Sequence, residues 1–474
     1  MDNKNRLSGP DNKMRTMPVA KLLFTMALPL ALSMLVQALY NVVDSVFVAQ
    51  YSANAVTALS LAFPIQNLQI GCATGIAVGM NSLLSKSLGE GNQQRANLAA
   101  GNGILMTGIL IALFMLFGAF GVPAYYNMQS ISQTTARAGM DYSSICCLFT
   151  AGIFIEILGE RLLQASGRTV YTLYTQGTGA VLNIILDPLF ILGSAGLESW
   201  LGLKLPFYFP AMGAAGAAIA TVIGQWVAAV MAVIFNFTHN PDVSFRLKYL
   251  RPRWDISSKI LTVGIPSMIM MAIGSVMNFG MNQIFLGFDA IGETASGVFG
   301  VYFKLQSFFL MPLFGLNNAS ISIIAYNYGA RQPRRITKTL TYALSAAMVI
   351  MLLGLTVFQT VPQLLMGIFA SDEGGNFVSI GVSALRIVSL HFPLAAIGIA
   401  LGASFQALGN GIYSTITSLC RQLVVLLPAA YLLSLTGNVH SVWWSFPIAE
   451  VVSAAISLVL FFRIYRQRIK PMYQ

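Results

Sequence analysis

The sequence predicts an all-α integral membrane protein of about twelve transmembrane helices, in two pseudo-symmetric six-helix lobes around a central cavity. Long apolar runs, a scarcity of charge and an internal repeat lead to this prediction. Hydrophobic residues make up 56% of the 474-residue chain and charged residues 9%, whereas a soluble domain carries roughly 25% charged residues. The chain therefore lacks the charge to cover a water-facing surface of its size.

Apolar runs that reach or exceed the ~20 residues needed to cross a bilayer recur along the chain, separated by Gly, Pro and polar clusters. We expect helices near residues 20–49, 55–85, 97–121, 139–164, 170–193, 211–238, 258–287, 294–327, 337–366, 379–408, 412–435 and 440–465. The first run is too long for the apolar core of a secretory signal and lacks a cleavage site. We therefore expect it to remain as the first membrane span.

The net charge of +11 is distributed as a topology signal. Of the 27 Lys and Arg residues, 22 lie in the N-terminal leader, the even-numbered connections and the C-terminal tail. The positive-inside rule then predicts a multi-pass protein of the cell membrane with both termini in the cytoplasm. Charge in short connections does not form a nucleic-acid-binding face. No nucleotide-binding loop or catalytic constellation is recognisable, so we expect a protein that is not an enzyme and uses no nucleotide or cofactor.

The two halves of the chain share ordered motifs 237 to 242 residues apart. The pairs are Leu28-Pro29 with Ile265-Pro266, Gly75 with Gly315, Gln164 with Gln406, and Pro188 with Pro428. Parallel repeats of this kind are a design of secondary transporters. We expect a cytoplasmic leader at 1–21, an N-lobe at 22–238, a cytoplasmic linker at 239–257, a C-lobe at 258–466 and a tail at 467–474.

Two carboxylates lie deep inside apolar runs of the first half. Asp44 shares a helix face with Gln37, Tyr40 and Asn41, and Asp187 lies one turn after Asn183. Acidic residues within the membrane are costly and indicate function by default. Burial and a neighbouring acid both disfavour the charged form, so we expect Asp44 and Asp187 to take up a proton or a cation as a coupled pair. In the alternative interpretation, these acids only join helices through hydrogen bonds.

Four segments resemble the multidrug and toxic compound extrusion (MATE) family. They are residues 40–45, 75–89, 183–188, with its Asn-x-x-x-Asp-Pro pattern, and Arg421-Gln422. The resemblance spans nearly the whole chain. It implies a monomeric prokaryotic exporter that exchanges protons, sodium or both for amphipathic, often cationic compounds by alternating access. It also implies that ion coupling, including any sodium site, uses Asp44, Asn183, Asp187 and Thr221.

Further polar residues have predicted places in this scheme. We expect the substrate cavity to include Gln37, Tyr40, Asn41, Glu156, Asn278, Asn282 and Lys304. Pro29 and Pro188 are expected to let their helices bend, and Arg421 to form a structural ion pair with Glu450. Glu160 and Arg161 are expected near the membrane interface. Met281 and Leu427 occupy the C-lobe positions equivalent to Asp44 and Asp187, which predicts coupling in the N-lobe alone.

The main alternative function is a flippase of lipid-linked saccharides or cell-wall precursors. Such proteins typically show extra helices or a strongly cationic central cavity that holds pyrophosphate. The predicted helices here contain few buried basic residues, which favours the exporter.

Overall fold

The structure is a computed structural model that describes residues 13–128, 132–202, 206, 208–288, 291–369 and 375–473. Some side chains within these ranges, including that of Asn41, lie outside the described set. The described residues form helices and contain no strand. Ten of these helices are long and apolar enough to cross a membrane, or up to twelve spans if two bent helix pairs each count as one. The all-α membrane fold is therefore confirmed.

The chain forms two compact units, each built mainly from one half of the sequence. Unit 1 includes Leu32–Gly264, and unit 2 includes the described residues before Leu32 and those from Ile265 onward. The division therefore falls inside two long helices, α2 (Val19–Tyr51) and α10 (Trp254–Leu286). The lobes expected at 22–238 and 258–466 assigned each of these helices to a single lobe. In the structure, the first turns of α2 belong to unit 2 and the first turns of α10 belong to unit 1.

Each of these dividing points lies beside a proline. Pro29 lies shortly before the division of α2, and Pro266 is the second residue after the division of α10. Proline has no N–H to donate within a helix, which weakens the helix locally. The repeated prolines thus mark the same structural transition in both halves.

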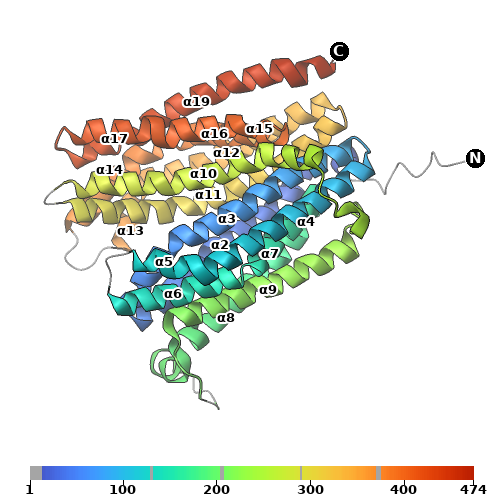
Figure 1. Cartoon of the computed structure of the whole chain (residues 1–474). Coiled ribbons are helices and arrows are strands. Elements are labelled where there is room, and N and C mark those ends of the chain that lie inside the picture. Colours follow the sequence, from blue (N-terminus) through green and yellow to red (C-terminus); the bar gives the residue numbers. More distant parts are fainter. Residues whose placement is uncertain are drawn as a thin grey trace, which may run out of the picture. The chain divides into compact units, whose positions relative to one another are not determined.

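Unit 1 is a bundle in which α9 packs along α8 and α7, and α3 packs against α4, α6 and α7 (Figure 1). Its remaining elements are α3 (Ala53–Gly89), α4 (Gln93–Leu116), η1 (Phe117–Gly121), α5 (Val122–Asn127), α6 (Gln133–Leu148), α7 (Ala151–Ala165), α8 (Val170–Leu201), α9 (Gly213–His239) and η2 (Leu247–Tyr249). Side-chain caps begin three of these helices, because Ser52, Asn92 and Ser132 each accept a hydrogen bond from a backbone N–H three residues later.

Unit 2 repeats this helical plan, with α11 packed against α12, α14 and α15, and α15 packed against α19. Its other elements are α1 (Lys13–Thr16), α11 (Gly292–Gly329), α12 (Pro333–Thr360), α13 (Pro362–Gly367), α14 (Gly375–Ser389), α15 (Phe392–Ala407), α16 (Gly411–Leu419), η3 (Cys420–Val425), α17 (Leu426–Ser434), α18 (Val439–Val442), α19 (Ser445–Ile464), η4 (Tyr465–Ile469) and η5 (Lys470–Tyr473). Arg335 of α12 donates hydrogen bonds to the Met14 and Met17 carbonyls, which fixes the start of the chain's first long helix to this unit.

Two spans expected as single helices are bent. The span predicted at 139–164 consists of α6 and α7, which meet at 46°, and the span predicted at 379–408 consists of α14 and α15, which meet at 49°. In the second pair, Pro393 lies in the first turn of α15, where its missing N–H costs no helix hydrogen bond. The two breaks occupy equivalent positions in the two halves, so the repeat extends to irregular backbone.

Among the described residues, three π-helical segments interrupt or end α-helices. A proline lies two or three residues after the last residue of each segment. The segments η1, η3 and η4 are associated with Pro123, Pro428 and Pro471. In an α-helix, the carbonyl four residues before each proline would accept a hydrogen bond from that residue's N–H, which proline lacks. This carbonyl lies inside the π-helical segment in all three cases. A shift to wider π-type bonding accommodates the lost donor. The span predicted at 412–435 is consequently divided into α16, η3 and α17.

Candidate cation site of the N-lobe

Helix α8 places an acid and an amide side by side in the interior of unit 1. Asp187 is fully buried and Asn183, one turn earlier, is 3% exposed. The Nδ2 atom of Asn183 donates to Oδ1 of Asp187 over 3.1 Å, and to Oγ1 of Thr221 over 3.4 Å. The Asn-x-x-x-Asp spacing thus works as expected from helix geometry, because residues four apart lie on one face. Asn183, Asp187 and Thr221 form one hydrogen-bonded group across α8 and α9.

A pair of glycines allows α8 and α9 to approach closely enough for this bond. A Cβ atom on Gly224 would lie 2.8 Å from the carbonyl oxygen of Gly179, and one on Gly179 would lie 3.1 Å from the carbonyl oxygen of Gly224. Small residues at a helix crossing permit such backbone contact in membrane proteins. Thr221, one turn before Gly224, is thereby brought to Asn183.

Helix α2 supplies the second acid. The Asp44 carboxylate interacts electrostatically with that of Asp187, and both interact with the Tyr40 side chain. Tyr40 is also hydrogen-bonded to Gln37, one turn earlier. Sequence spacing placed Gln37, Tyr40 and Asp44 on a common face, and the structure directs that face toward α8.

Three buried oxygen atoms in this group accept no hydrogen bond from the described residues. They are Oδ1 of Asp44, Oδ1 of Asn183 and Oδ2 of Asp187. Buried polar atoms are normally hydrogen-bonded, so each such exception calls for an explanation. A proton on one carboxylate, or a hard cation coordinated by carboxylate and amide oxygens, would satisfy them. The residues present therefore fit a proton or a sodium ion.

No cluster of three or more His, Cys, Asp or Glu side chains suited to a metal occurs in the described part of the chain. A cation held here would therefore need the Asn183 amide and the Thr221 hydroxyl in addition to the two carboxylates. This ligand set contains only oxygen, which favours hard cations over transition metals.

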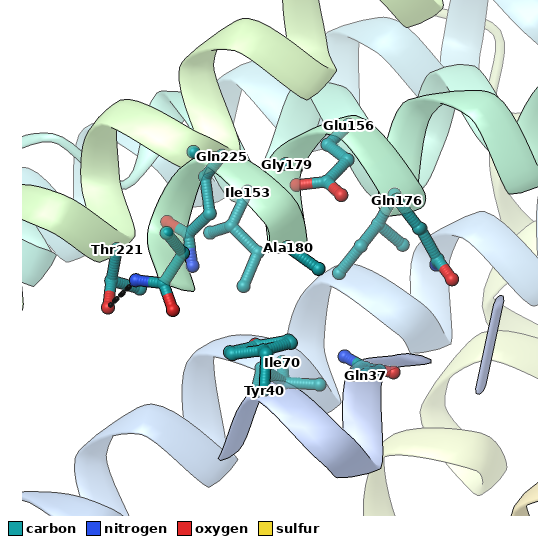
Figure 2. A pocket seen from close by; sticks show the side chains of 13 residues that line it. Gln37, Tyr40, Ile70, Ile153, Glu156, Gln176, Gly179, Ala180, Thr221 and Gln225 are labelled. Carbon is teal, nitrogen blue, oxygen red and sulfur yellow. Dashed lines mark hydrogen bonds between the residues drawn. The ribbon is translucent and has the colours of Figure 1, made fainter. Parts of the chain in front are cut away.

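A cavity of about 70 Å³ adjoins this group inside unit 1. Its lining residues come from five helices: Gln37, Tyr40, Ile70, Ile153, Glu156, Ile157, Gln176, Gly179, Ala180, Asn183, Thr221, Gly224 and Gln225. Figure 2 shows Gln37 and Tyr40 across the open space from Glu156 and Gln225. Drug-sized ligands occupy cavities of roughly 300–1,000 Å³, whereas a water molecule needs about 10–15 Å³ of such volume. The cavity in this conformation therefore suits an ion with a few waters.

A second acidic pair, which the sequence pattern did not identify as a unit, lies on α7. Glu160 accepts hydrogen bonds from Thr175 Oγ1 at 2.6 Å and from Gln176 Nε2 at 2.8 Å, and its charge interacts with that of Glu156. Glu160 is 3% exposed and Arg161 is 7% exposed. Partners on α8 and within α7 satisfy both side chains, and the expectation that they lie near the membrane interface stays a prediction.

The predicted residues of the second half lie in unit 2. Asn278 donates to the Gly274 carbonyl, Asn282 accepts from Ser296 at 2.7 Å, and Lys304 is exposed. Their place in a substrate cavity stays a prediction, as does that of Asn41, whose side chain is outside the described residues. Arg421 and Glu450 lie 3.6 Å apart. Pro29 lies inside an α-helix, and Pro188 lies shortly before Gly193, where α8 leaves helical geometry with φ 67° and ψ −176°; the bending role of both prolines stays a prediction.

Replacing Gly224 with valine should destabilise unit 1, because the new side chain would collide with the α8 backbone. We expect a loss of about 1–3 kcal/mol in unfolding free energy, typical of an overpacked contact, measured as a lower Tm of the purified protein. Gly177→Val is the matched control, since nothing lies within 4 Å of a Cβ atom at that position. Equal Tm values for the two variants would contradict the close-approach argument.

Comparison with known proteins places this geometry in context. The model of the MatE family matches residues 29–189 and 266–432, one stretch in each half. The FAD transporter of Shewanella oneidensis is 24% identical over 446 residues, covering 92% of each chain. The multidrug export protein MepA of Staphylococcus haemolyticus is 24% identical over 449 residues, covering 93% of each chain. A crystal structure of MATE in complex with MaL6 matches with a TM-score of 0.89 at 23% identity, over 98% of this chain and all of the other.

Proposed function

Because the chain belongs to the MatE family of membrane transporters, we propose that it is a secondary multidrug exporter that exchanges protons or sodium ions for amphipathic, cationic compounds. The observation that carries the proposal is the group of unpartnered buried oxygens on Asp44, Asn183 and Asp187. Binding a cation would give these oxygens the partners that they lack. Cation binding is also the event that an antiporter must couple to export. The proposed location is the cell membrane, with both termini in the cytoplasm and the protein acting as a monomer.

Coupling would follow from the charge of the acid pair. When a proton or sodium ion is bound, the repulsion between Asp44 and Asp187 is reduced and α2 can remain close to α8. When the cation leaves, two buried carboxylates face each other without compensation. Relief of that repulsion favours a different position of α2, and Pro29 supplies a weak point at which the helix can bend. A cation gradient can thus bias the two conformations that alternating access requires.

The N-lobe cavity is too small for a drug in this conformation, but the charge on its lining favours cationic substrates over anionic ones. Its lining contains the Glu156 carboxylate and no Lys or Arg. One relative is named an FAD transporter and another a multidrug export protein. FAD carries a negatively charged diphosphate, which needs basic partners such as Arg or Lys. The flippase alternative has the same requirement for its pyrophosphate group, so the observed lining supports neither.

The proposal is tested by ethidium efflux from vesicles that contain the purified protein, with proton and sodium gradients imposed separately. Efflux driven by at least one inward cation gradient is expected, and the gradient that drives it identifies the coupling ion. No efflux of ethidium or of a panel of other cationic dyes under either gradient would overturn the exporter proposal.

A further inference from the structure

A second cavity in unit 1 lies between α4, α7, α9 and the linker that follows α9, and encloses about 300 Å³. The residues lining it are Asn97, Ala100, Gly101, Ile104, Ile155, Leu158, Gly159, Leu162, Val233, Asn236, Phe237, Ser244, Phe245, Arg246, Tyr249 and Leu250. Its volume is at the lower end of the roughly 300–1,000 Å³ typical of ligand sites. None of its lining residues belongs to the acid group described above.

Most of this cavity is apolar, and its two asparagine side chains are already engaged. Asn97 Oδ1 accepts hydrogen bonds from the backbone N–H of Ser244 and from Gln93. Asn236 Nδ2 donates to the Gly159 and Ala232 carbonyls, both at 2.8 Å. The interior therefore offers aliphatic and aromatic surface to a ligand, which suits a hydrocarbon chain better than a polar molecule.

One end of the cavity is cationic. Arg246 is exposed and forms no salt bridge with the described residues, and the Lys248 ammonium lies 4.9 Å from the centre of the Tyr249 ring. A hydrogen bond with Asn97, together with the nearby Lys248 and Arg246 charges, lowers the pKa of Tyr249. These observations place both cations beside the cavity wall. The linker acids Asp242 and Asp255 are paired with Arg168 and Arg253, so they do not neutralise this end.

The surface around the cavity has the character of a membrane interface. Leu247 is 83% exposed, Trp254 is 76% exposed and Phe237 is 67% exposed. Aromatic and apolar side chains next to basic ones are typical of the boundary between the hydrocarbon and headgroup layers. The apolar part of the cavity thus lies next to its cationic end. A phospholipid needs this arrangement, because its acyl chains are joined to a charged headgroup.

We propose that this cavity is a specific site for an anionic phospholipid, with an acyl chain among α4, α7 and α9 and the phosphate at Arg246 and Lys248. Basic pockets between transmembrane helices on the cytoplasmic side bind lipid headgroups in this way. This site is independent of the proposed transport cycle and does not require it.

Binding is measured on the full-length, delipidated protein in detergent by native mass spectrometry, with phosphatidylglycerol and phosphatidylcholine of identical acyl chains as probes. Phosphatidylglycerol is expected to bind more tightly and to raise the Tm. Arg246→Gln should weaken phosphatidylglycerol binding by about fivefold, since one cation near the headgroup is lost. Arg251→Gln is the matched control, because Arg251 is an exposed linker cation whose side chain does not line the cavity.

The apolar part is tested separately. Val233→Trp fills the cavity and should weaken binding of both lipids, whereas Val230→Trp, at an exposed position outside the lining, should leave it within about twofold of wild type. Equal affinity for the two lipids would overturn the proposal. An equal effect of Arg246→Gln and Arg251→Gln would also overturn it, because it would indicate attraction by diffuse surface charge.

Discussion

Asp187→Asn should strongly reduce gradient-driven efflux while leaving the protein folded. The side chain is fully buried, and its Oδ2 atom has no partner among the described residues. Asparagine keeps the shape but cannot carry the negative charge that attracts a proton or a sodium ion. Without differential cation binding, a gradient cannot shift the conformational equilibrium. We expect coupled efflux to fall by about ten- to hundredfold, the usual size of a coupling free energy, measured as ethidium efflux from energised vesicles.

Asp44→Asn is expected to have the same effect, because the two carboxylates act as a pair. Equilibrium ethidium binding to each variant, measured by fluorescence polarisation, separates loss of coupling from loss of the substrate site and should remain near wild type. Asp141→Asn is the control, since it removes an exposed acid from α6 of the same unit. Wild-type efflux by Asp187→Asn or by Asp44→Asn would show that the acid pair does not couple export.

Arg421→Gln should give a large stability defect, and the loss should be asymmetric between the two members of this pair. Glu450 is 4% exposed, whereas the Arg421 side chain is 29% exposed. Removing Arg421 leaves a buried carboxylate without a partner, at a cost of about 3 kcal/mol. Removing the charge of Glu450 leaves a cation that is much less enclosed by the protein than the carboxylate is. We therefore expect Arg421→Gln to lower Tm by about 5 °C or more and Glu450→Gln to lower it much less.

The double variant Arg421→Gln/Glu450→Gln should recover most of the lost Tm, because no uncompensated charge remains. Arg463→Gln, at an exposed position in α19, serves as the control for loss of a cation from the same unit. A double variant less stable than Arg421→Gln alone would contradict the ion-pair interpretation. Thermal unfolding of the detergent-solubilised protein, followed by intrinsic fluorescence, measures all four variants.

Several features of the fold and the site followed from the sequence because the membrane imposes them. A bilayer accepts only long apolar helices or closed barrels, so apolar runs predict spans directly. A carboxylate inside such a run is energetically unfavourable, so the sequence alone identifies Asp44 and Asp187 as candidate functional residues. Helix periodicity then groups Gln37 and Tyr40 with Asp44, and Asn183 with Asp187. The structure brings these groups together, and it joins Asn183 to Thr221 of α9, which only the family resemblance had implied.

Other features depend on packing between residues distant in sequence, which no local pattern contains. Glu160 accepts hydrogen bonds from Thr175 and Gln176 on α8, which are 15 and 16 residues away and so share no helix periodicity with it. Nothing in the first sequence half alone predicts that the start of α2 packs with the second unit.

The sequence by itself thus determined the membrane class, the repeat and the pair of acids, because burial in lipid penalises charge and rewards apolar length wherever they occur. Only the tertiary structure decided where spans bend, how α2 and α10 are shared between the units, and which oxygens remain without partners. Those properties arise from contacts such as Gly179 against Gly224, in which the allowed distance between two backbones decides which side chains meet.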